Sequence, residues 1–147
     1  LAFNAHMNDL GNIQIAGVAL SDFEGEDILR IMGENLGATR LGTAKAGDGE
    51  AVRVRKLVNL LDEYRITAVD LMKIDVEGDE WRLLRPFFAE APKSLFPKRI
   101  IMERFEVTGV TRGDAVDPMP RLARLGYVEE RHARRNVILR RSGPGAD

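Results

Sequence analysis

Carboxylates cluster in the segment KIDVEGDE, residues 73–80, and they are the side chains of this chain best suited to chemistry. Asp75 and Glu77 stand at or just beyond the end of an apolar run that begins at Thr67. A buried strand has no need of a carboxylate, because burying an unpaired charge is costly. Glu103 repeats the pattern at the end of the next apolar run. Ligands of open α/β sheets bind beyond the carboxyl ends of the strands, so we take Asp75, Glu77 and Glu103 as candidate catalytic residues.

These carboxylates have other possible roles. Neighbouring strands lie about 4.8 Å apart, so Asp75 and Glu103 could converge on one ligand, proton or cation. Together with Glu77 they could hold Mg²⁺ or Ca²⁺, which leaves a metal-dependent hydrolase as a weaker alternative. In a purely structural role they would cap a helix or pair with nearby cations: Lys73, Arg99 and Arg104.

The elements that must position these residues alternate between strand and helix. The run 67–76 carries apolar residues on both faces, which is typical of a central parallel strand covered by helices. Hydrophobic spacing predicts further strands at 12–20, 26–31, 51–56, 99–105, 127–130 and 136–141. The first ten residues are predicted to be the end of a helix, and further helices are predicted at 56–65, 80–85 and 121–126. Asp79 is expected to cap the helix at 80–85, and Pro86 to break or restart it. The glycine-rich stretch 33–49 is predicted to be a loop. The order predicts an α/β sandwich of helix, mixed sheet and helix.

Composition narrows the class of protein. The 147 residues suit one domain, and 22 basic residues against 23 acidic ones leave no excess of positive charge for nucleic acid. The absence of cysteine excludes disulfides and thiolate chemistry, and His6 and His132 are too far apart in sequence to suggest a metal site. No apolar run approaches the roughly 18 residues of a membrane span, and no signal peptide is visible. We therefore expect a cytoplasmic protein that binds a small molecule and neither nucleic acid nor membrane.

The run VDLMKIDVEGDEWRLLRPF, residues 69–87, resembles the signature segment of the FkbM family of S-adenosylmethionine-dependent methyltransferases. The specific part is KIDVEG. Weaker likenesses follow the family's order along nearly the whole chain. They comprise residues 8–12, 18–25, 54–61 (where Lys56 and Val58 replace the usual Thr and Asp), 100–103, 125–127 and 136–139.

This resemblance implies a Rossmann-like, three-layer methyltransferase fold with a mixed sheet. It also implies methyl transfer to a hydroxyl oxygen of a sugar, polyketide or similar secondary metabolite. Ser21 and Asp22 would touch the adenine of S-adenosylmethionine, while Asp75 and Glu77 would face the sulfonium and the acceptor. The alternative for Ser21 and Asp22 is an ordinary Asx-type turn between strands.

The family's domain opens with a strand, a glycine-rich turn, a helix and a second strand, and none of these is found in the 147 residues. We therefore expect a single, partial domain over 1–147 whose sheet lacks its first two strands, with a frayed tail at 142–147. Leu1 favours the C-terminal part of a longer methyltransferase. The alternative is a remnant that binds no cofactor and acts as a dimerisation or partner-binding module through its exposed sheet. In either case we do not expect this chain alone to bind S-adenosylmethionine tightly.

Overall fold

A computed structural model describes residues 2–31, 39–41, 49–76, 78–103, 116–133 and 135–143. The elements in chain order are α1 (Ala2–Met7), β1 (Ala19–Leu20), β2 (Gly25–Ile31), β3 (Thr39–Leu41), β4 (Glu50–Arg55), α2 (Leu57–Glu63), β5 (Leu71–Ile74), α3 (Glu80–Glu90), the 3₁₀ turn η1 (Lys93–Leu95), β6 (Arg99–Glu103), α4 (Met119–Arg124), β7 (Tyr127–Ala133) and β8 (Asn136–Arg141).

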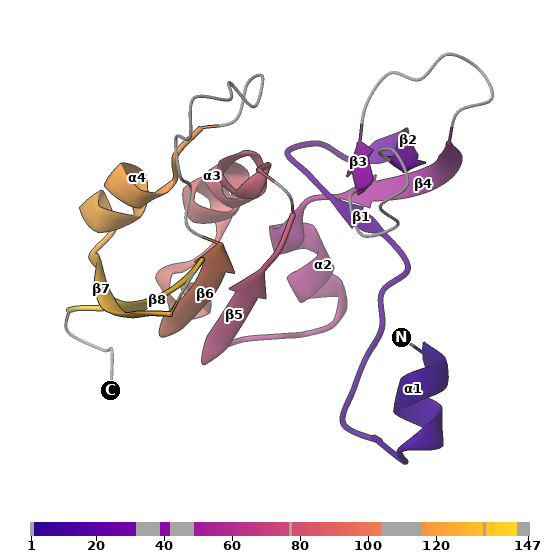
Figure 1. Cartoon of the computed structure of the whole chain (residues 1–147), viewed down its shortest axis with the longest axis horizontal. Coiled ribbons are helices and arrows are strands. Elements are labelled where there is room, and N and C mark those ends of the chain that lie inside the picture. The colour runs from indigo at the N-terminus through magenta and orange to yellow at the C-terminus, as the bar shows by residue number, and fades with distance from the viewer. Residues whose placement is uncertain are drawn as a thin grey trace.

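The described strands form two four-stranded sheets, in the orders β1-β4-β2-β3 and β5-β6-β8-β7 (Figure 1). Each sheet is mixed, because β1 runs parallel to β4 and β5 runs parallel to β6, whereas the other pairs are antiparallel. The predicted α/β class with mixed strand directions is confirmed, as is the closing antiparallel pair β7–β8. This arrangement is compatible with a Rossmann-like methyltransferase fold.

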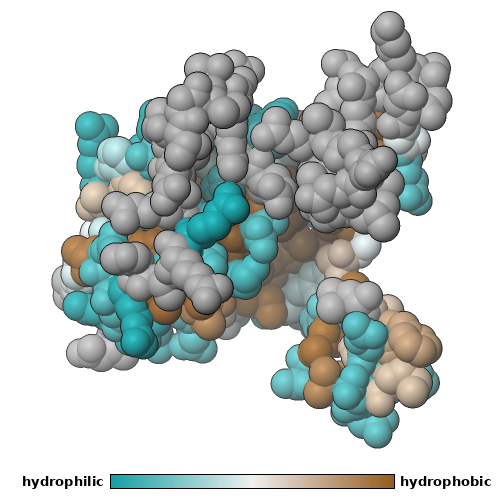
Figure 2. Space-filling model, viewed as in Figure 1, coloured by the Kyte–Doolittle hydropathy of each residue, from teal (hydrophilic) through white to brown (hydrophobic). Residues whose placement is uncertain are grey.

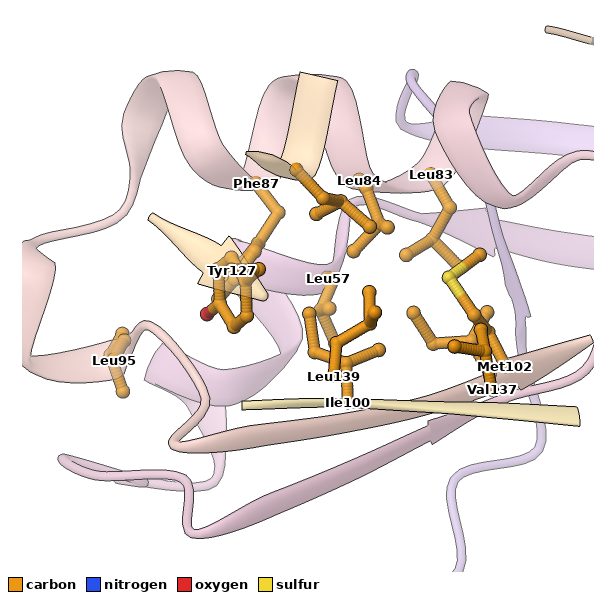
Figure 3. Packing of buried hydrophobic residues seen from close by; sticks show 12 residues of the cluster. Leu57, Leu83, Leu84, Phe87, Leu95, Ile100, Met102, Tyr127, Val137 and Leu139 are labelled. Carbon is orange, nitrogen blue, oxygen red and sulfur yellow. The ribbon is translucent and has the colours of Figure 1, made fainter. Parts of the chain in front are cut away.

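The main core lies between the sheet β5-β6-β8-β7, called here the β5–β7 sheet, and the helices α2, α3 and α4. Alternate residues of β6 and β8 point into it, with Ile100, Met102, Val137 and Leu139 almost wholly buried. Helix α3 faces them with its apolar stripe (Figure 3), and α2 and α4 add one buried leucine each: Leu83, Leu84 and Phe87 of α3, Leu57 of α2 and Leu122 of α4. Burying such side chains contributes about 1.5–3 kcal/mol each, so this core fixes α3 against the ends of the strands.

Helix α3 runs unbroken through Pro86, so the predicted break is wrong. A proline removes a single hydrogen bond from the helix interior. The bonds on either side remain, from the Leu83 amide to the Asp79 carbonyl and from the Ala91 amide to the Phe87 carbonyl. Pro86 itself is buried, and its neighbours on the apolar stripe hold both halves of the helix on the sheet.

The predicted strands at 12–20 and 67–76 are shorter than expected. Only Ala19–Leu20 forms ladder bonds in the first run, and only Leu71–Ile74 in the second. Ladder bonds need a neighbouring chain, and β4 meets the first run only from Val54 to Arg55. The interpretation of 67–76 as a centrally covered strand is also wrong for the described residues, since β5 is an outer strand and Leu71 is 55% exposed.

The ends of the chain also differ from expectation in detail. Helix α1 forms as predicted but lies apart from the other elements (Figure 1), and its apolar side chains face solvent (Figure 2). The stretch 33–49, predicted as a loop, contains the short strand β3, and its residues 33–38 and 42–48 lie outside the described residues. In the predicted tail, both the amide and the hydroxyl of Ser142 donate to the Gly126 carbonyl, at 2.7 and 2.8 Å, while 144–147 lie outside the described residues.

Candidate functional site

The loop after β1 carries Ser21 and Asp22, and it contacts β4 on one side and α3 on the other. The Ser21 amide donates to the Arg55 carbonyl at 3.0 Å, which continues the β1–β4 ladder by one residue. Ser21 is buried, and its hydroxyl lies 3.3 Å from Asp22 Oδ1. The backbone of this loop is therefore fixed by β4, and the Asp22 side chain is directed away from it.

Asp22 is held by two arginines of α3. Arg82 Nε donates to its Oδ1 at 2.9 Å and Arg85 Nη2 to its Oδ2 at 3.0 Å. Residues three apart share one face of a helix, which is why both guanidinium groups reach the same carboxylate. Partial burial would raise the pKa of Asp22, but the hydrogen bond and charge of Arg82 outweigh it and lower the pKa below its ordinary 3.8. These two ion pairs, called here the ion-pair bracket on Asp22, link the loop after β1 to α3.

Asp75 follows β5 directly, and its side chain is 60% exposed. Its Oδ2 accepts a hydrogen bond from Lys73 Nζ at 2.7 Å, because residues two apart in a strand share a face. The β5–β6 register ends with Ile74 opposite Met102, and Asp75 and Glu103 are the next residues along the two chains. Glu103 Oε1 lies 2.8 Å from Arg135 Nε. Two of the three predicted carboxylates thus end adjacent strands, and each has its own cation; Glu77 lies outside the described residues.

The turn into α3 is built around a glycine and a buried glutamate. Gly78 has φ = 104°, a conformation that side-chain-bearing residues rarely adopt. Its amide donates to Glu80 Oε1 at 3.2 Å, and Glu80 is only 5% exposed. Asp79 occupies the predicted cap position, but its side chain makes no capping bond, so that prediction is wrong. The sequence indicated the turn through Gly78, but it gave no sign that Glu80 would be buried.

A second charged cluster, also missed from the sequence, fixes the junction between β4 and α2. Glu24 accepts hydrogen bonds from Arg55 Nε at 2.6 Å, the Lys56 amide at 2.9 Å and Asn59 Nδ2 at 2.7 Å. Arg55 also donates to Glu63 at 2.6 Å. The Lys56 amide, followed by Asn59 and Arg55, lowers the pKa of Glu24 below its ordinary range. Glu24 therefore accepts the hydrogen bond of the Lys56 backbone amide at the start of α2, although it lies 32 residues earlier in the chain. No local sequence pattern could indicate this contact.

Two hollows flank α2 in the described part of the molecule. One, of about 220 Å³, is mainly apolar and lies between the chain at 14–16 and the residues Leu60, Leu61, Tyr64 and Ile66. The other, of about 360 Å³, lies between α2 and the turn at 92–95. Neither is lined by Asp22, Asp75 or Glu103, so these hollows do not belong to the carboxylate site.

The described residues contain no group of three histidine, aspartate or glutamate side chains arranged to hold a metal. Asp75 and Glu103 alone do not make a cation site, and the third residue of that hypothesis, Glu77, is not described. None of the helices in this part of the chain is long and apolar enough to span a membrane.

The two mixed sheets and their helices define the class as an α/β protein, and their arrangement is compatible with a Rossmann-like methyltransferase fold. The chain matches the methyltransferase FkbM domain over residues 4–129 and belongs to that family. The family therefore indicates methyl transfer, with S-adenosylmethionine as the usual donor. No curated protein and no solved structure matched the chain.

Proposed function

We propose that this protein transfers a methyl group from S-adenosylmethionine to a hydroxyl oxygen of a sugar or another secondary metabolite, in the cytoplasm. The observation that carries the proposal is the exposed Asp75 carboxylate at the end of β5, within the KIDVEG segment of a chain that belongs to the FkbM family. An accessible carboxylate at the carboxyl end of a parallel strand is placed where α/β proteins bind ligands.

The residues present suit S-adenosylmethionine to different degrees. The Asp75 carboxylate is open to solvent and complements the positive charge of a sulfonium. Both Asp22 oxygens already accept bonds from arginines, so Asp22 suits the cofactor by fixing its loop rather than by offering a free carboxylate. The buried Ser21 belongs to the same fixed loop. We therefore propose Asp75 as the residue nearest the sulfonium and Ser21 and Asp22 as the residues nearest the adenine.

The chemistry required of the protein is modest. The bound cofactor supplies an already activated methyl group, so the protein must align an acceptor hydroxyl and help to remove its proton. Asp75 would accept the hydroxyl hydrogen, and Lys73, 2.7 Å away, holds that carboxylate in place. Glu103, at the end of the strand that pairs with β5, is the second candidate to orient the acceptor, and Glu77 follows from the family resemblance.

The test uses the protein expressed from its complete coding sequence, S-adenosylmethionine labelled in the methyl group, and a panel of hydroxylated sugars and polyketide alcohols. Asp75→Asn should reduce transfer by about a hundredfold or more while the circular dichroism and the unfolding midpoint stay unchanged. Asp70→Asn is the matched control, because Asp70 is 84% exposed and precedes β5 on the same segment. Full activity of Asp75→Asn would refute the role given to Asp75.

A further inference from the structure

Arg121 of α4 lies on the indole ring of Trp81, which belongs to the first turn of α3. Its guanidinium carbon is 5.3 Å from the centre of the ring, a distance typical of a cation–π contact. Both side chains are half-buried, and α3 and α4 lie on the same side of the β5–β7 sheet (Figure 1). Trp81 follows Asp75 by six residues in the chain. Arg121 is therefore a positive charge held at the start of the helix that follows the candidate carboxylate.

Most of the Arg121 guanidinium group has no partner in the described part of the molecule. Its Nη1 donates to the Asp117 carbonyl at 2.9 Å. Its Nε and Nη2 donate to none of the described residues, and none of their carboxylates forms an ion pair with it. These two nitrogens form a parallel pair of donors, which fits two oxygens of a carboxylate or of a phosphate. Trp81 and the Asp117 carbonyl thus hold the group without using the donors that would bind an anion.

The carboxylates of the candidate site do not need Arg121. Each one that the structure describes has its own cation, in the pairs Asp22 with Arg82 and Arg85, Asp75 with Lys73, and Glu103 with Arg135. The charge of Arg121 is therefore left for a group from outside the described residues, and the donor pair selects an anion with two oxygens.

We propose that Arg121, held by Trp81, binds an acidic group of the acceptor, either a carboxylate or a phosphate, a role that rests on the proposed function. The acceptor hydroxyl would lie at Asp75 while the acidic group pairs with Arg121. The acceptor is then an acidic sugar or another acidic alcohol, because a neutral molecule would leave the donor pair of Arg121 unused.

The first experiment measures binding without methyl transfer, by isothermal titration calorimetry on the protein expressed from its complete coding sequence. The probes are glucose 6-phosphate, glucuronate and glucose, which carry a phosphate, a carboxylate and no acidic group. At least one acidic probe should bind about tenfold or more tightly than glucose, and the pattern tells phosphate from carboxylate. Arg121→Gln should abolish this preference, and Arg121→Lys should weaken it, because an ammonium group keeps the charge but not the paired donors.

Arg141→Gln is the matched control. Arg141 stacks on Phe96 at 5.4 Å in the same manner, but it lies by the turn before β6, where it donates to the Phe96 carbonyl. This variant should keep the preference for the acidic probe. Loss of the preference in Arg141→Gln, with Arg121→Gln unaffected, would assign the binding to the wrong arginine and overturn the proposal.

The second experiment locates the bound probe through the fluorescence of Trp81, taken as the difference between wild type and Trp81→Phe. The acidic probe should change this signal, because it binds the guanidinium group that lies on the indole. Equal affinity for all three probes, binding that Arg121→Gln leaves intact, or an unchanged Trp81 signal overturns the proposal. Neither measurement needs turnover, so a protein that binds the acidic probe through Arg121 but methylates no acceptor contradicts the proposed function alone.

Discussion

The ion-pair bracket on Asp22 should be visible in the stability of the protein. Asp22→Asn keeps the shape of the side chain but removes the charge that Arg82 and Arg85 share. Asp22 is the least exposed of the three, with 23% of its side chain accessible, against 45% for Arg82 and 64% for Arg85. Charge-assisted bonds contribute about 1.5–3 kcal/mol when buried, but exposed pairs contribute about 1 kcal/mol or less. With both arginines largely exposed, we expect Asp22→Asn to lower the free energy of unfolding by about 1 kcal/mol.

The sign of the pH dependence follows from the lowered pKa of Asp22. A carboxylate with a lower pKa in the folded than in the unfolded state stabilises the fold above its unfolded pKa, near 3.8, and this stabilisation is lost as the pH falls through the folded value. The difference between wild type and Asp22→Asn should therefore be constant near neutral pH, shrink below about pH 4 and vanish in stronger acid.

Urea denaturation followed by circular dichroism at several pH values measures both effects. Asp70→Asn serves as the control, because Asp70 makes one ion pair, at 3.1 Å to Lys98, and is 84% exposed. That control should lose less than about 0.5 kcal/mol. Equal urea midpoints for wild type and Asp22→Asn at neutral pH, or a difference that persists unchanged in strong acid, would refute the bracket as an electrostatic link between the β1 loop and α3.

Three further outcomes follow from the site. Glu24→Gln should lower the free energy of unfolding by about 1 kcal/mol in urea denaturation, because it removes the charge that accepts from the Lys56 amide at the start of α2 and that pairs with the buried Arg55. Gly78→Ala should cost about 1–3 kcal/mol in the same assay, since φ = 104° strains any residue with a side chain; an unchanged midpoint would contradict the conformation given to this turn. Methyl transfer should survive a chelator such as EDTA, and loss of activity that Mg²⁺ or Ca²⁺ restores would favour the metal-dependent alternative instead.

Local patterns predicted the elements whose neighbours are close in sequence. The alternation of Val52 and Val54 predicted β4, and the spacing of Leu57, Leu60 and Leu61 predicted α2. The closing pair β7–β8 has only two residues between its strands, so its partner was evident from the chain itself. In each case the hydrogen-bonding partner or the buried face is specified within a few residues.

The run 67–76 shows where this reasoning fails. Apolar residues on both faces predicted a covered central strand, but whether a face is covered depends on elements far away in the sequence. Leu71 is 55% exposed among the described residues, and the strand is only four residues long. Periodicity gives the strand and its two faces, but not its position in the sheet.

The candidate site depends on contacts of the same long-range kind. Asp22 was predicted as a cofactor contact or as part of an ordinary turn, and both interpretations considered only its immediate neighbours. Its partners, Arg82 and Arg85, lie 60 and 63 residues further along the chain. They reach it because the core side chains of α3 fix the helix on the β5–β7 sheet, while β4 fixes the loop that carries Asp22. The roles of Asp75, Glu77 and Glu103 stay predictions from the sequence, whereas the arginines that hold the loop after β1 could be identified only from the packing of α3.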